Sequence, residues 1–88
     1  MALLRLPEVI RLSGYSRSML YALISQGLYP KPVKISERAV AWPSEEVEQM
    51  VRAVVARSSP AQRKDLVVSI ESGRLALLAS REAAGVKS

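Results

Sequence analysis

The 88-residue sequence contains neither cysteine nor histidine. The lack of cysteine excludes a disulfide framework and a thiolate zinc site, and it is compatible with a reducing cytoplasm. The lack of histidine removes the most common metal ligand and the most common general base in proteins. We therefore expect no metal site, no cofactor and no catalytic residue, and we predict that the protein is not an enzyme.

Long hydrophobic runs are also missing from the sequence. The apolar N-terminal stretch MALLRLPEVI is interrupted by Arg5 and Pro7 after only a few residues. It therefore matches neither a secretory signal nor a membrane span. We expect a cytoplasmic protein without a membrane partner.

Positive charge and apolar residues are abundant. Thirteen Lys and Arg residues against eight Asp and Glu give a formal net charge of +5, and 49% of the residues are hydrophobic. This composition indicates a folded domain with a modest core rather than a disordered tail. The excess of positive charge favours a polyanionic partner such as nucleic acid, although a merely basic protein surface would have the same composition.

Two short helices joined by a glycine turn are predicted over residues 7–26. Pro7 suits the first turn of a helix, and Ser13 followed by Gly14 ends it. Ser16 is placed to cap the second helix, and Gly27 is placed to end it. The apolar side of the first helix comprises Val9, Ile10 and Leu12, and that of the second comprises Met19, Leu20, Leu23 and Ile24. This pattern is typical of a helix-turn-helix.

An extended segment and a third helix follow. Two prolines at 30 and 32 disfavour a helix, and alternating residues predict a β-hairpin wing over 33–42 that turns at 36–38. We expect Ser44 to cap the third helix. We also expect its apolar stripe to pack under the two shorter helices and its acidic residues to form a solvated face. The stripe is Val47, Met50, Val51, Val54 and Val55, and the acidic residues are Glu45, Glu46 and Glu48.

The C-terminal segment, residues 58–88, has a less regular pattern. The apolar residues Leu66, Ile70 and Leu77 share one side of a helix with Arg63, Arg74 and Arg81, and Gly73 interrupts the run. We favour a helix, and a hairpin is the alternative interpretation. The sequence thus predicts a mostly α fold with a small β-hairpin. Residues 1–57 would form a winged helix-turn-helix domain, and residues 58–88 a helical segment available for self-association.

The polar residues of the second helix form one strip opposite its apolar face. At about 100° per residue, Arg17, Ser18, Tyr21 and Ser25 span roughly 0° to 100°, whereas the apolar residues span roughly 200° to 340°. Arginine can fork to guanine, serine can bond several base edges, and tyrosine can bond a phosphate or stack. Recognition helices usually meet bases near their N-terminus. We predict that these residues, together with Ser16, contact double-stranded DNA in the major groove.

Basic residues continue into the predicted hairpin. Lys31 and Lys34 lead into it, and Arg38 lies at its tip. A wing of this kind can contact backbone phosphates or place an arginine in the adjacent minor groove. Lys31, Lys34 and Arg38 therefore complete the predicted DNA-binding residues.

Three stretches within residues 4–57, LRLPEVIRLSGYSRSMLYALISQG, YPKPVKIS and RAVAWPSEEVEQMV, carry a family resemblance. They resemble the AlpA-type phage regulators, which belong with the excisionase and MerR-like winged helix-turn-helix proteins. The resemblance implies a small DNA-binding activator of prophage genes, and some relatives act as directionality factors in excision. It also implies that Ser16, Arg17, Ser18 and Tyr21 face DNA, that Arg38 is the wing arginine, and that Trp42 anchors the wing onto the helix that follows.

These features predict a sequence-specific DNA-binding prophage regulator. One helix in one groove reads only a few base pairs, so dimerisation, tandem binding, or contact with RNA polymerase or an integrase must add selectivity. The nearest alternative is an architectural role in excision, in which the protein bends DNA. An alternative from a different class is a small adaptor that binds another protein through its C-terminal apolar segment.

Overall fold

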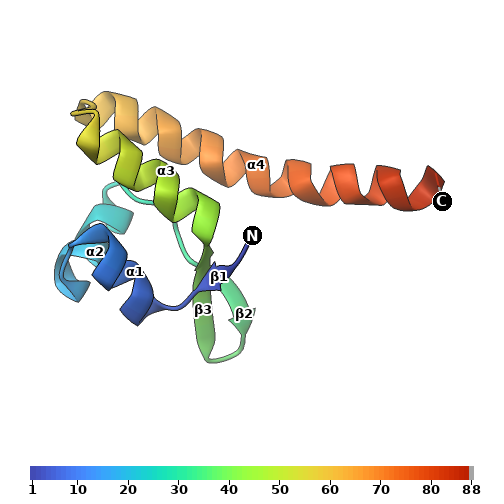
Figure 1. The fold of residues 1–88 in the computed structure, drawn as a ribbon, viewed down its shortest axis with the longest axis horizontal. Coiled ribbons are helices and arrows are strands. Elements are labelled where there is room, and N and C mark those ends of the chain that lie inside the picture. The colour runs from blue at the N-terminus through green and yellow to red at the C-terminus, as the bar shows by residue number, and fades with distance from the viewer. Residues whose placement is uncertain (88) are drawn as a thin grey trace.

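The computed structural model describes the backbone of residues 1–87 and the side chains of residues 1–77. The described chain forms, in order, β1 (Leu3–Leu4), α1 (Leu6–Ser13), α2 (Arg17–Ser25), β2 (Val33–Ser36), β3 (Ala39–Pro43), α3 (Ser44–Val55) and α4 (Pro60–Lys87), as Figure 1 shows. This order confirms the predicted fold class, a mostly helical winged helix-turn-helix with a C-terminal helix. Within residues 1–87, none of the helices combines the length and apolar content that crossing a bilayer requires.

The helix-turn-helix forms as its local sequence predicts. α1 ends at Gly14, whose φ of 79° lies in the left-handed region that glycine adopts without a steric penalty. The Ser16 side chain then accepts a hydrogen bond from the Met19 backbone N–H at 3.2 Å and so caps α2. α2 ends at Ser25 with Gln26 as its C-cap, and Gly27, the next residue, has a φ of 75°. The turn and both ends of α2 are thus fixed by short-range interactions.

The sheet has one strand more than the sequence predicts. The hairpin β2–β3 is confirmed, but β1 also pairs antiparallel with β3, which gives the order β1-β3-β2. The Ser44 N–H donates to the Ala2 carbonyl at 2.7 Å, and the Ser44 hydroxyl accepts from the Ala2 N–H at 3.0 Å. The prediction that Ser44 caps α3 is therefore wrong: Pro43 is the N-cap, and the Ser44 hydroxyl instead fixes the N-terminal strand.

Trp42 is at the centre of the core. Its side chain is fully buried, and its indole N–H donates to the Pro30 carbonyl at 2.9 Å. The indole therefore connects β3 to the linker, residues 26–32, between α2 and β2. The buried residues around it come from four helices and the linker, and they are Val9, Leu20, Tyr29, Val47, Met50, Val67 and Ile70. The predicted role of Trp42 as an anchor next to α3 agrees with this position.

The apolar stripes are covered only in part. Leu12 on α1 and Met19 on α2 are about half exposed, at 51% and 50%, although both were expected on buried faces. On α3, Val47 and Met50 are buried as predicted, but Val55 is 77% exposed and Val54 is also exposed. The twelve-residue α3 is longer than the eight-residue α1 and the nine-residue α2. Periodicity identified the correct face, but the shorter helices cannot cover its last turn.

α4 confirms the helical interpretation of the C-terminal segment and excludes the hairpin. Val67 and Ile70 enter the core and Leu66 packs against it, whereas Leu77 is 55% exposed, contrary to prediction. The second half of α4 extends past the other elements (Figure 1). Arg81 lies outside the described side chains, and the division of the chain at residues 57 and 58 remains a prediction.

Candidate nucleic-acid interface

The predicted polar strip of α2 lies on the protein surface. Arg17, Ser18, Tyr21 and Ser25 are all exposed, while Leu20 on the opposite side of the helix is fully buried. Burial of one face and capping by the exposed Ser16 together fix the rotation of α2 about its axis. The N-terminal turn of α2 therefore presents an arginine and a serine outward, which is the end of a recognition helix that usually reaches bases.

Ser25 differs from the rest of the strip because its hydroxyl proton is already used. The Ser25 hydroxyl donates to the Ala22 carbonyl, one turn earlier, at 2.7 Å. This local bond leaves the oxygen able to accept but leaves no proton to donate to a phosphate. Among the strip residues, Ser25 is thus the least suited to a phosphate contact.

Met19 is a surface residue that sequence reasoning placed in the core. Its half-exposed side chain lies on the flank of α2 opposite Arg17 and Tyr21. Met19 therefore faces away from the strip that is predicted to contact DNA. The signal for its exposure was available, because Met19 lies at one edge of the apolar arc, where exposure depends on neighbours from elsewhere in the chain.

The hairpin presents two cations at the surface. Ser36 pairs with Ala39, so Glu37 and Arg38 form a two-residue turn, and the register shifts between Lys34 and Ser36. Lys34 and Arg38 are both exposed. The hairpin therefore carries one cation along β2 and one at its tip, as predicted.

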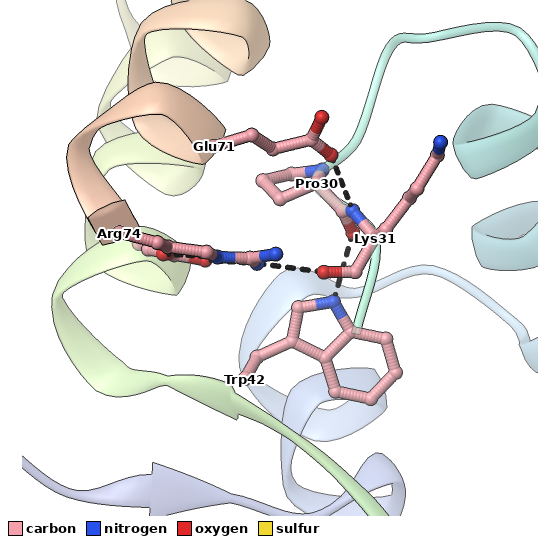
Figure 2. A network of polar contacts seen from close by, with 6 residues as sticks. Pro30, Lys31, Trp42, Glu71 and Arg74 are labelled. Carbon is pink, nitrogen blue, oxygen red and sulfur yellow. Dashed lines mark hydrogen bonds and ion pairs between the residues drawn. The ribbon is translucent and has the colours of Figure 1, made fainter. Parts of the chain in front are cut away.

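Lys31 lies outside the hairpin, in the segment that joins α2 to β2. Its backbone N–H donates to Glu71 Oε2 at 2.9 Å, and its carbonyl accepts from Arg74 Nη2 at 2.6 Å. Figure 2 shows the Lys31 side chain extending away from both of these partners. Lys31 is thus exposed, but its backbone is held by α4 rather than by the wing that it was expected to enter.

Glu46 does not belong to a solvated acidic face. Glu46 is only 7% exposed, and its carboxylate accepts two hydrogen bonds from Arg74, one from Nε at 2.9 Å and one from Nη2 at 2.6 Å. This bidentate contact raises the pKa of the Arg74 guanidinium above its usual value. The prediction of a solvated face is wrong for Glu46, because an arginine 28 residues away is folded over it.

The cations of α2 and the hairpin remain available for a partner. The ion pairs among the described side chains are Glu8–Arg11, Glu48–Arg52 and Glu46–Arg74. None of them involves Arg17, Lys31, Lys34 or Arg38. An arginine that forms no ion pair can fork to a guanine or a phosphate without first breaking one. The surface is therefore suited to a polyanion.

The part of the chain that carries this surface is similar to known proteins. The model of the family described as prophage CP4-57 regulatory protein (AlpA) matches residues 2–55, a range that ends with the last turn of α3. A protein of Enterobacteria phage P4 named "Uncharacterized protein ORF88" is 48% identical over 44 residues, which is 50% of this chain and 50% of that protein. The match thus spans about half the length of this relative. The whole of α4 lies outside the family match.

Proposed function

Because this chain belongs to the AlpA family of phage regulatory proteins, which confirms the resemblance of its sequence, we propose that it is a sequence-specific DNA-binding regulator of prophage genes. In this proposal α2 lies in the major groove and the β2–β3 hairpin contacts the backbone or the adjacent minor groove. α2 is about 13 Å long at 1.5 Å per residue, which fits a groove about 12 Å wide. Ser16, Arg17, Ser18 and Tyr21 would read or border the bases.

The single observation that carries the proposal is that the surface of α2 and the hairpin exposes basic side chains that form no ion pairs with described side chains. Arg17 on α2 and Arg38 at the hairpin tip are exposed, and neither has an acidic partner among the described side chains. A helix whose only role was to support the core would not require this combination. Lys34 and Lys31 add sequence-independent attraction for phosphates.

Selection from random duplexes followed by fluorescence anisotropy tests the proposal. We expect nanomolar binding to the enriched duplex and much weaker binding to a scrambled duplex of the same composition. Failure to bind any duplex at low salt would overturn the proposal and leave the protein-binding adaptor as the remaining function.

The architectural role in excision makes a different prediction about the arrangement of sites. Bending of DNA favours several adjacent copies with strong wing contacts, so its sites should be direct repeats beside an integration site. A regulator should instead have its sites at a promoter. Footprinting of the prophage ends and promoters distinguishes the two roles.

Self-association would supply the selectivity that one reading helix lacks. We place it on the half of α4 that extends past the other elements, where Leu75 and Leu77 are exposed. Paired copies would double the number of base pairs read and therefore multiply the discrimination. Sedimentation equilibrium with and without DNA measures the stoichiometry, and monomers in both conditions would leave contact with RNA polymerase or an integrase as the source of selectivity.

A further inference from the structure

A groove of about 390 Å³ runs between the C-terminal end of α2 and the first half of α4. Its apolar wall includes Ile24 and Val67, and its polar groups include Ser25, Lys31 and Lys64. These three polar residues come from α2, from the linker and from α4. The groove is thus continuous with the exposed strip of α2, because Ser25 belongs to both.

The exposed free donors of this groove are ammonium groups, and the buried Tyr29 hydroxyl, whose residue also lines the groove, has no hydrogen-bond partner among the described residues. Lys31 and Lys64 are both exposed, and neither forms an ion pair with a described side chain. The Ser25 hydroxyl proton is bonded to Ala22, and the Gly27 N–H is bonded to the Ile24 carbonyl. Two ammonium groups that form no ion pair and line one groove are suited to an anion such as a phosphate.

Glu71 is the one acidic residue lining the groove. Its Oε2 accepts from the Lys31 N–H, which orients the carboxylate toward the linker backbone. Its negative charge nevertheless opposes any anion bound beside Lys31. The groove therefore contains two cations that should favour a phosphate and one anion that should disfavour it.

We propose that this groove binds a phosphate of the DNA backbone next to the segment contacted by α2, with Lys31 and Lys64 as its cations. The inference rests on the proposed function and extends it to α4, which the family match does not include. The hairpin and the first turns of α4 lie at opposite ends of the folded body (Figure 1), and Ser25 of α2 lines the same groove as Lys64, so a duplex on α2 would be held by the wing at one end and by Lys64 at the other.

Paired charge substitutions of opposite sign test this inference by anisotropy on the selected duplex at 50 and 200 mM salt. Loss of one phosphate contact lowers the salt slope by about 1. Lys64→Ala should therefore weaken binding to all duplexes alike, with a deficit that shrinks about 3-fold between the two salt concentrations. Glu71→Gln keeps an acceptor for the Lys31 N–H but removes the negative charge, and it should tighten binding by up to about 3-fold at 50 mM.

Arg52→Ala is the matched control, because it removes one exposed positive charge from α3 at a position that does not line this groove. We expect it to leave the salt slope unchanged. Native affinity and slope in Lys64→Ala, or equal losses in Lys64→Ala and Arg52→Ala, would overturn the inference while the native protein still binds its site. Absence of native binding would overturn the proposed function itself. Circular-dichroism melting establishes that each variant is folded.

Discussion

Positive charge has different roles in two regions of this molecule. On α2 and the hairpin, Arg17, Lys34 and Arg38 are exposed and form no ion pair among the described side chains. At the junction of α3 and α4, Arg74 is bonded to both oxygens of Glu46 and to the Lys31 carbonyl. The formal charge of +5 does not separate these roles. The positions of the acidic partners separate them. A basic composition therefore predicts a binding site for a polyanion only where the cations form no ion pairs.

The largest effect is expected where the two regions are joined. Trp42→Ala removes a fully buried indole and its hydrogen bond to Pro30. We expect a loss of about 3–5 kcal/mol in the free energy of unfolding, typical of buried aromatic residues. Denaturant unfolding measures this loss. An unchanged melting temperature would show that burial of Trp42 and its hydrogen bond to Pro30 do not stabilise the fold.

A second substitution tests whether the junction is structural. Glu46→Gln leaves the partly buried Arg74 guanidinium without its counter-charge, and we expect a loss of about 2–3 kcal/mol in the free energy of unfolding. Glu48→Gln is the matched control, because the pair of Glu48 with Arg52 is exposed and should contribute less than about 1 kcal/mol. Similar small losses of stability in the two variants would show that the buried ion pair of Glu46 contributes no more to stability than the exposed ion pair of Glu48.

The reading surface should show the opposite behaviour. Arg17→Ala should relax discrimination by about 1–3 kcal/mol at one base pair and leave the melting temperature nearly unchanged. Lys34→Ala, the control, should weaken binding to all duplexes alike and lower the salt slope by about 1. Competition anisotropy with single-base variants of the site measures both. Unchanged base preference in Arg17→Ala would mean that α2 is not the reading helix.

The smallest effect is expected at the C-terminal ends of α2 and α3, which form the same pattern of backbone hydrogen bonds. At the end of α2, Gly27 N–H bonds to Ile24 and Leu28 N–H bonds to Leu23; at the end of α3, Arg57 and Ser58 make the equivalent bonds. Gly27 has a φ of 75°, but Arg57 has a φ of 58°, which costs a residue with a Cβ about 1–2 kcal/mol. Arg57→Gly should therefore raise the free energy of unfolding by up to about 1 kcal/mol, after the greater entropy of unfolded glycine is subtracted. A lower melting temperature would mean that the Arg57 side chain stabilises the loop.

The sequence predicted those parts of the structure that depend on near neighbours. The Ser16 cap, the glycines that follow α1 and α2 and the β2–β3 hairpin all depend on residues a few positions apart, and all are predicted correctly. The turn of the hairpin lies at residues 37–38 rather than 36–38. Ser44 and Glu46 were misplaced because their partners, Ala2 and Arg74, lie 42 and 28 residues away. No local pattern contains that information.

The candidate site shows the same division. Amphipathic spacing located the exposed strip of α2, because the side opposite a buried face is exposed whatever covers the core. That Lys64 lines the same groove as Ser25 depends on where α4 packs, and the interrupted apolar pattern of α4 did not predict that packing. The DNA contacts themselves remain predictions that the binding experiments test.

The bonded linker between α2 and β2 has a consequence for the geometry of an operator. The carbonyls of Pro30 and Lys31 and the Lys31 N–H are all occupied, by Trp42, Arg74 and Glu71 (Figure 2). These hydrogen bonds hold the linker in one conformation and so define the distance and angle between helix and wing in this structure. Since each base pair turns a duplex by about 35°, inserting a single pair between the two contacted segments would put them out of phase. Spacing inside a site should thus be as invariant as the bases that are read.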